Sequence, residues 1–327
     1  MNRNLLKWGG GFLVLLSLLF SLNRFFKNKR LNEMHWRDVG GQELILRRNG
    51  LEKLNPHMSL RSLLLDHKSE MTKLKEGKLV YRAVYTVDKK GFRISKATNL
   101  PGKTKHFLII DGSIAFGEGL NDDETIHHLI NMRSKIYEAY ELGFLGYGPQ
   151  HNWLRFNSKQ LGFDIHQKRG SAILITHAQD FRRLIGTLDH LIYSSNFPLL
   201  VESSPGKFEH RGNFINNGTL LQRIAARFCV PFLFCKKFMA KSFKGPDENQ
   251  VAFAARLYDS IEKMYREQFD VEDLKIVWVG EEDVAIFKKF SKIKIIKIPF
   301  DRIDSSHPSA QGAKEIVDFL FSQKIIY

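Results

Sequence analysis

Cysteine is almost absent from this sequence, with two residues among 327. Cys229 and Cys235 stand at the edges of the apolar run VPFLF, which reads as a strand. Six residues of extended chain hold two Cα atoms about 20 Å apart, well beyond disulfide reach. Two cysteines without a matching histidine cluster also predict no metal site. We therefore expect core thiols, with no disulfide, no metal and no other cofactor.

Repeats, low-complexity segments and common nucleotide-binding motifs are also missing. The nine prolines and 24 glycines are scattered, which excludes solenoid, collagen-like and linker-rich proteins. There is no G-x-S-x-G elbow, P-loop or dinucleotide fingerprint, which argues against α/β-hydrolases, NTPases and Rossmann oxidoreductases. The hydrophobic content of 43% is enough for a substantial core in a chain of this length.

Acidic residues are scarce in the N-terminal third. Residues 1–105 carry 22 Lys and Arg against 8 Asp and Glu, while the remaining residues carry 28 against 27. The formal net charge of +15 therefore lies almost entirely near the N-terminus. No zinc-finger spacing, aromatic RNA-binding motif or basic heptad helix accompanies this charge, so we expect no nucleic acid partner. The charge suits an anionic membrane surface, and a generally basic, solvated face is the alternative.

An uncharged apolar segment occupies residues 8–22, with basic residues on both sides. It is shorter than an ideal membrane span of about 20 residues, but flanking basic side chains can extend it by reaching the headgroups. No small-x-small cleavage site follows, which favours an uncleaved signal anchor over a removed signal peptide. We expect the rest of the chain on the extracytoplasmic, periplasmic side. The alternative is the cytoplasmic side, because more positive charge follows the segment than precedes it.

Residues 31–104 are predicted to form a juxtamembrane arm between the anchor at residues 1–30 and a main domain at residues 105–327. Residues 59–75 carry leucines and a methionine near helical spacing, which predicts a helical arm. Residues 79–87 are rich in β-branched and aromatic side chains, and a turn signal follows them. We expect a β hairpin there.

After residue 105, short apolar runs alternate with amphipathic stretches of helical period. The runs lie at residues 106–110, 172–176, 198–201, 230–234, 274–279 and 293–298, and helices are expected near residues 124–135, 151–161, 220–228, 249–269 and 281–290. This alternation predicts an α/β domain with a mostly parallel sheet that helices cover on both faces. Such sheets bind ligands at the carboxyl ends of their strands, so we expect the chemistry just after these runs.

Two motifs occupy such positions. Ser113 follows the first run on a glycine-containing turn, which can present a hydroxyl and a backbone N–H to a crevice. After the last run, Asp304 stands three residues before His307, where a tight turn lets the carboxylate accept an imidazole N–H. Alone, each motif is a weak signal, because serine turns and histidines near helix starts are common.

In combination, the two motifs resemble those of the SGNH hydrolase superfamily, the GDSL-like lipases and esterases. Gly91-Phe92-Arg93 and the segment FGEGLNDDET at residues 116–125 also look like bacterial members. The resemblance runs from about residue 81 to the C-terminus and implies a flavodoxin-like three-layer sandwich. It implies Ser113 as the nucleophile, His307 as the general base that then protonates the leaving group, and Asp304 as the residue that orients the histidine.

The resemblance also implies an oxyanion hole with three donors. These are the Ser113 N–H, the Gly146 N–H and the side-chain amide of Gln179. Gln179 stands where the family has asparagine, and its extra methylene moves the donor by about 1 Å. The order Asp-Gly-Ser replaces the family's Gly-Asp-Ser at Ser113, and Glu141 stands where asparagine is common.

These features predict a serine esterase or O-acyl transferase that works through an acyl-Ser113 intermediate on a lipid or acylated glycan near the membrane. Hydrolysis and transfer to a sugar hydroxyl use the same triad, so both outcomes stay open. The second hypothesis is a membrane-anchored pseudoenzyme that binds a glycan or protein in the same crevice, because Asp111, Gly112 and Gln179 break the family pattern.

Overall fold

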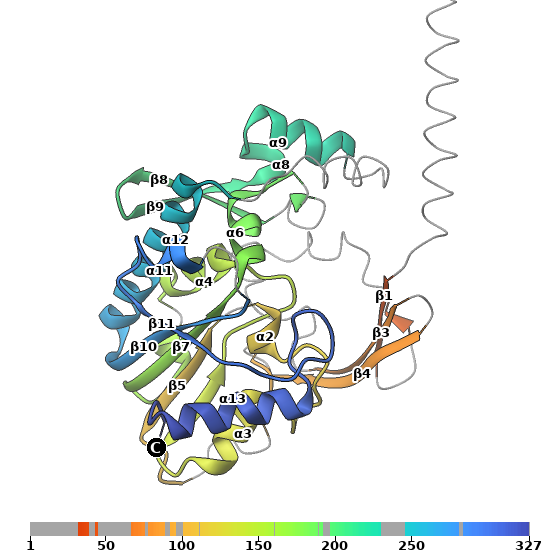
Figure 1. The fold of residues 1–327 in the computed structure, drawn as a ribbon, viewed down its shortest axis with the longest axis vertical. Helices are drawn as coiled ribbons and strands as arrows, with labels where there is room; N and C mark the ends of the chain where they lie inside the picture. Colours follow the sequence, from red (N-terminus) through yellow and green to blue (C-terminus); the bar gives the residue numbers. More distant parts are fainter. Residues whose placement is uncertain are drawn as a thin grey trace, which may run out of the picture.

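Five parallel strands form the sheet at the centre of the chain (Figure 1). In spatial order they are β11 (Lys294–Lys297), β10 (Asp270–Trp278), β7 (Arg169–Thr176), β5 (Lys105–Ile110) and β6 (Tyr137–Glu141). All four neighbouring pairs are parallel. The structure is a computed structural model, and it describes residues 32–38, 43–44, 67–75, 78–88, 92–95, 101–110, 112–159, 161–188, 190–191, 197–229, 246–280 and 284–326.

Helices cover both faces of this sheet, so the domain has three layers (Figure 1). One face carries α4 (Pro149–Asn157), α5 (Leu161–Asp164), α6 (Ala178–Ile185), α11 (Glu248–Gln268) and α12 (Val284–Phe287); the other carries α2 (Ser113–Phe116), α3 (Ile126–Arg133) and α13 (Ala310–Ser322). Alternate residues of β5 enter different cores: Leu108 and Ile110 pack in the first, Phe107 and Ile109 in the second. The predicted α/β class and parallel sheet are confirmed.

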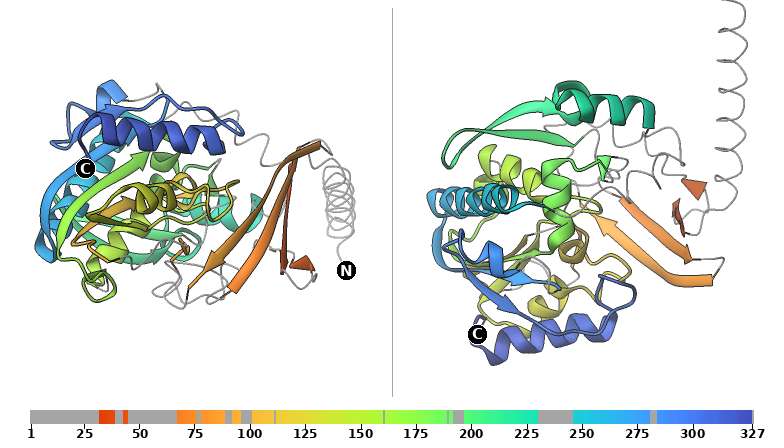
Figure 2. Two further views of the ribbon diagram at one scale, coloured as in Figure 1. Left: turned by 90° about the horizontal axis from the view of Figure 1, so that it is seen from below. Right: turned by 45° about the horizontal axis from the view of Figure 1, so that its top comes forward.

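A second, antiparallel sheet stands beside the three layers as a twisted ribbon (Figure 2). Its strands lie in the order β2 (Glu43–Leu44), β1 (Asn32–Asp38), β3 (His67–Lys75) and β4 (Lys78–Val87). The hairpin strand expected at residues 79–87 is confirmed as β4. After β4 the chain folds back, and the Ile94 N–H donates to the Thr86 carbonyl.

The helical arm predicted over residues 59–75 is wrong in its described part, because residues 67–75 form strand β3. Most of the leucines that suggested a helix lie before residue 67, outside the described residues. Within β3, Met71 is fully buried and pairs in register with Ala83 of β4. The strand obtains its backbone hydrogen bonds from β1 and β4, and helical spacing carries no information about such distant partners.

The apolar run at residues 198–201 forms a strand, but not in the central sheet. It belongs to β8 (Pro198–Ser204), which pairs antiparallel with β9 (Lys207–Asn213) in a separate hairpin. Three short helical elements follow: α8 (Phe214–Asn217), α9 (Leu220–Ile224) and the π-helix η2 (Ala225–Cys229). The place of a central strand is taken instead by β6, which the sequence pattern did not predict.

Several predictions fall on residues that the structure does not describe. These are the anchor at residues 8–22, the run at residues 230–234, Cys235 and Asp111. Among the described residues, no helix combines the length and apolar character that crossing a membrane requires.

Candidate active site

Ser113 begins the short helix α2, directly beyond the carboxyl end of β5. The preceding Gly112 leaves no room for a side chain, because an added Cβ would lie 2.6 Å from the Tyr147 carbonyl oxygen. Gly117 ends the helix in the left-handed conformation, with φ of 79°. The buried strand and the two glycines therefore place the Ser113 hydroxyl at the edge of the sheet where parallel α/β proteins bind ligands.

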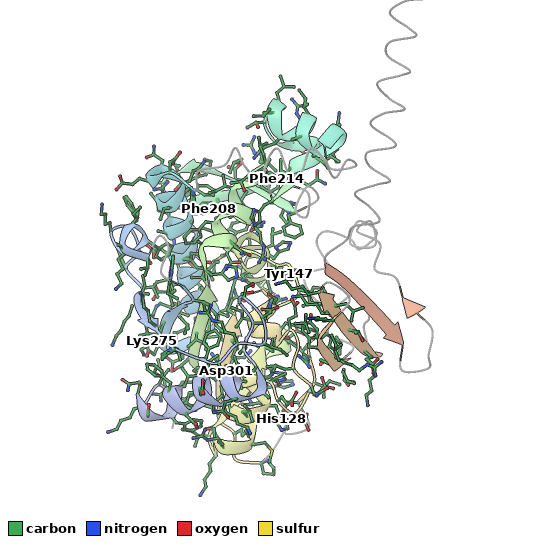
Figure 3. All side chains as sticks on the ribbon, turned by 45° about the vertical axis from the view of Figure 1, so that its right-hand side comes forward. His128, Tyr147, Phe208, Phe214, Lys275 and Asp301 are labelled. Carbon is green, nitrogen blue, oxygen red and sulfur yellow. The ribbon has the colours of Figure 1, made fainter. Side chains whose placement is uncertain are left out.

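His307 and Asp304 lie in a tight turn between β11 and α13. A bridge between Arg302 and Pro308 closes this turn, and the Ser309 hydroxyl caps the first turn of α13 by accepting from the Gly312 N–H. Gly312 packs so closely on the turn that a Cβ there would lie 1.9 Å from the Asp301 carbonyl oxygen. Figure 3 labels Asp301 in this segment. The buried face of α13, with Ala313, Ile316, Val317 and Leu320 in the second core, holds this turn against the sheet.

The three side chains predicted as a triad meet in the structure. The Ser113 Oγ lies 2.7 Å from the His307 Nε2. The His307 Nδ1 lies 2.9 Å from each oxygen of the Asp304 carboxylate. Because Nδ1–H donates to this carboxylate, Nε2 is the nitrogen that accepts the hydroxyl proton of Ser113. All three groups are largely enclosed, with Ser113 only 5% exposed.

The charge of Asp304 is maintained by its neighbours. Partial burial acts to raise the pKa of this carboxyl, but its hydrogen bonds from His307 and Lys73 act in the opposite direction and prevail. The Asp304 pKa is therefore held well below its ordinary value. The backbone N–H groups of Ser306 and His307 also donate to its Oδ1, each at 2.9 Å. Asp304 is thus an ionised acceptor with a fixed orientation.

A second carboxylate, Glu118, contacts the same histidine. Its Oε2 lies 3.2 Å from the His307 Nε2, and its Oε1 accepts from the Tyr81 hydroxyl at 2.7 Å. Glu118 lies between Gly117 and Gly119, whose φ angles of 79° and 88° are readily adopted only by glycine. The Lys73 Nζ links the two acids, at 3.3 Å from Glu118 and 2.8 Å from Asp304.

Glu118, Asp304 and His307 are the described residues that come near enough together to suggest a metal site, with donor atoms within 4.8 Å of one another. The contacts of these donors favour a different arrangement. Lys73 places an ammonium group against both carboxylates, and His307 Nε2 bonds to Ser113. A cation here would meet the positive charge of Lys73, so the cluster fits a hydrogen-bonded relay better than a metal site.

The loop that carries Gly146 packs directly on the turn that carries Ser113. An added Cβ on Gly143 would lie 2.3 Å from the Gly112 carbonyl oxygen, so this approach requires glycine. Gly146 itself has φ of 79°, while its Cβ position would have no close neighbour. Tyr147, labelled in Figure 3, packs with Phe116 and Phe144 in the hydrophobic cluster between the three-layer α/β domain and strands β3 and β4. The loop is therefore placed beside Ser113.

Gln179, the third expected oxyanion donor, occupies the first turn of α6 just beyond β7. Its side chain is exposed, whereas the neighbouring Asp180 is buried and accepts from the His177 N–H at 3.0 Å. Gly146 and Gln179 thus both lie at the carboxyl edge of the sheet, as Ser113 does. Their role as oxyanion donors remains a prediction.

Arg93 holds the segment that carries Glu118. Its fully buried guanidinium donates to the carbonyl oxygens of Phe116 and Gly117 at 2.7 and 2.8 Å, and it pairs with Asp122 at 3.1 Å. It also donates to the Leu120 carbonyl at 2.5 Å. The Arg93 side chain therefore holds most of the segment between α2 and α3 in place through hydrogen bonds.

Glu141 gives a stability prediction. This carboxyl is buried near Arg155 and accepts from the Gly143 N–H, and burial raises its pKa to about 7. Its proton is therefore held more tightly in the folded state than in the unfolded state, so the contribution of Glu141 to stability should fall as pH rises from about 5 to 7. We therefore expect the stability of wild type relative to Glu141→Gln to fall by about 1–3 kcal/mol of unfolding free energy between pH 5.5 and 8.

Urea unfolding at the two pH values measures this difference. Glu267→Gln serves as the control, because Glu267 is exposed on α11 and should leave the slope unchanged. Equal pH slopes for wild type and Glu141→Gln would contradict the account of Glu141.

Three residues of the site were not predicted: Glu118, Lys73 and Tyr81. Glu118 offered a signal, since it follows Ser113 by five residues in the segment already noted as similar to bacterial SGNH proteins. Lys73 offered none, because 231 residues separate it from Asp304. No protein-family model and no curated protein matches this chain.

Proposed function

We propose that the chain is a serine esterase or acyl hydrolase of the SGNH kind that acts through an acyl-Ser113 intermediate. The observation that carries the proposal is the hydrogen-bonded series from Ser113 through His307 to Asp304, with distances of 2.7 and 2.9 Å. The α/β sandwich with its site beyond the parallel strands supports the finer assignment to the flavodoxin-like SGNH fold. An ester bond is the substrate class that this series suits.

In the proposed mechanism, His307 Nε2 removes the Ser113 proton while Oγ attacks the ester carbonyl carbon. The positive imidazole is stabilised by Asp304, and it then delivers the proton to the leaving alcohol as the carbon–oxygen bond breaks. The Ser113 N–H and the Gly146 N–H are the proposed donors to the oxyanion, together with the Gln179 amide. Water or a sugar hydroxyl then attacks the acyl carbon while His307 takes its proton. The bond between the acyl carbon and Ser113 Oγ breaks as His307 returns that proton to Oγ.

The proposed substrate is an acylated lipid or glycan at a membrane surface. The support comes from the apolar segment at residues 8–22 and from the basic charge concentrated in residues 1–105. A signal anchor there would hold the catalytic domain near the bilayer on the periplasmic side.

A fluorophosphonate probe tests the proposal, because it phosphonylates serines that a histidine base activates. Full-length protein purified in detergent should be labelled at Ser113, as mass spectrometry of the labelled peptide can establish. Ser113→Ala should abolish labelling and the cleavage of short acyl esters. Ser305→Ala, an exposed serine in the same turn as His307, should keep both. Unlabelled, inactive wild type with a native fold would exclude the proposed function.

The alternative of a pseudoenzyme is favoured by the exposed Gln179 side chain in place of a family asparagine. In that case the crevice would bind a glycan or protein partner without turnover. Ser113→Ala and His307→Ala would then retain the cellular function, whereas large side chains introduced into the crevice would abolish it.

A further inference from the structure

Two carboxylates contact one histidine, and this poses a problem for a serine hydrolase. Asp304 accepts the Nδ1–H of His307, so Nε2 is the unprotonated nitrogen when the imidazole is neutral. Glu118 faces Nε2 at 3.2 Å, and a carboxylate gains from that contact only when Nε2 carries a proton. Glu118 therefore favours the positively charged ring, which cannot accept the Ser113 proton.

Lys73 provides a charge that opposes this effect. Its ammonium contacts Asp304 at 2.8 Å and Glu118 at 3.3 Å, so it offsets one of the two negative charges around the ring. The Lys73 side chain is only 16% exposed, which limits screening by solvent. Burial acts to lower the Lys73 pKa, but the two carboxylates outweigh it and raise the pKa. The lysine therefore stays charged throughout the working pH range.

We infer that Lys73 and Glu118 are a pair of positioning residues that balance the charge around the His307 imidazole, with Lys73 supplied by strand β3. Glu118 stabilises the protonated imidazole that forms when Ser113 attacks, and the positive charge of Lys73 opposes this effect of Glu118. This inference rests on the proposed function, because it concerns the same histidine in the same reaction.

The ribbon is built to hold Lys73 in place. β3 is paired on both edges, by β1 and β4, over most of its length. Met71 of β3 and Tyr81 and Tyr85 of β4 pack with Phe116 and Phe144 of the body. The Tyr85 hydroxyl accepts from the Gly119 N–H at 2.8 Å, so the ribbon is also hydrogen-bonded to the segment that carries Glu118.

The other polar groups that the structure describes near the ring do not supply a competing full charge. Tyr81, from β4, donates to Glu118, and burial beside that carboxylate raises the pKa of its phenol far above neutrality. His177, from the β7–α6 junction, is close enough for His307 to influence it, and burial lowers the pKa of its imidazole. Ser113, from α2, is neutral in the resting state. Among the residues that the structure describes, Asp304, Glu118 and Lys73 are thus the charged groups in this cluster around the ring.

The test is the pH dependence of the rate of fluorophosphonate labelling in full-length protein. This rate falls on the acid side when His307 becomes protonated, and the midpoint of that fall is the quantity compared. Lys73→Met should move the midpoint up by about one pH unit, because the site becomes more negative. Glu118→Gln should move it down by about one unit. The double variant should return it close to the wild-type value.

Matched variants separate charge from structure. Lys73→Arg should keep the wild-type midpoint, and Lys75→Met, which removes an exposed lysine from the same strand, should also keep it. If Lys73→Met and Glu118→Gln lower the plateau rate with no movement of the midpoint, both residues are merely structural and the inference is wrong. Failure of the proposed function gives a different result, since wild type itself would then remain unlabelled.

Discussion

Replacement of His307 by alanine is expected to lower kcat/KM for a short acyl ester by about 10⁴- to 10⁶-fold, with little change in KM. The Ser113 hydroxyl would lose the acceptor that lies 2.7 Å away, and the leaving alcohol would lose its proton donor. The double variant Ser113→Ala/His307→Ala should be no less active than either single variant. Both groups take part in one proton transfer, and removing either one stops it. The losses of kcat/KM in the single variants therefore do not add in the double variant.

Steady-state kinetics on the three variants and wild type measures this non-additivity. His166→Ala is the control, since His166 is an exposed histidine outside the site. Losses that multiply in the double variant would mean that Ser113 and His307 act independently, which contradicts the proposed relay.

Replacement of Arg93 by methionine is expected to destabilise the fold by about 3–5 kcal/mol. The variant leaves the carbonyl oxygens of Phe116, Gly117 and Leu120 without their buried donor and leaves Asp122 without its cation. A chain of this size should show this as a fall in Tm of roughly 10 °C. Arg93→Lys should rescue only part of the loss, because a single ammonium group cannot reproduce the several directions of the guanidinium.

Thermal unfolding followed by circular dichroism tests this prediction. Arg82→Met removes an arginine from the neighbouring β4, where the side chain is 57% exposed and pairs with Glu70. Its cost should stay below about 1 kcal/mol. A similar Tm for Arg93→Met and Arg82→Met would show that the buried guanidinium network contributes little.

Much of the α/β body was predictable from sequence because its strands are buried on both faces. Runs such as residues 106–110 and 172–176 then have no polar alternation, and they appear as continuous apolar segments. β6 escaped prediction because Glu138 and Glu141 interrupt its apolar residues, although both side chains are buried. The ribbon was harder still, because β3 depends on partners in β1 and β4 and has little apolar character of its own.

The residues of the candidate site also differ in how far the sequence alone predicts their positions. Ser113, Asp304 and His307 were predictable because each follows a strand of the sheet, and parallel strands bring such positions to one edge. The Asp304–His307 contact is local, within one turn. Lys73 comes from a different sheet, and its position depends on how the ribbon packs against Phe116 and Phe144. Glu118 needed the geometry of two left-handed glycines to turn its side chain toward the histidine.

The ribbon has a consequence for the smallest piece of this chain that can work normally. A fragment starting at residue 105 would contain the complete central sheet, Ser113, Asp304 and His307, and both hydrophobic cores except Phe92. It would also lose the buried Arg93 guanidinium. It would lack the lysine that balances the second carboxylate, and it would expose the aromatic surface that the ribbon covers. Under the proposed function, truncation at the apparent domain border should therefore shift the pH midpoint of Ser113 labelling, as is expected for Lys73→Met.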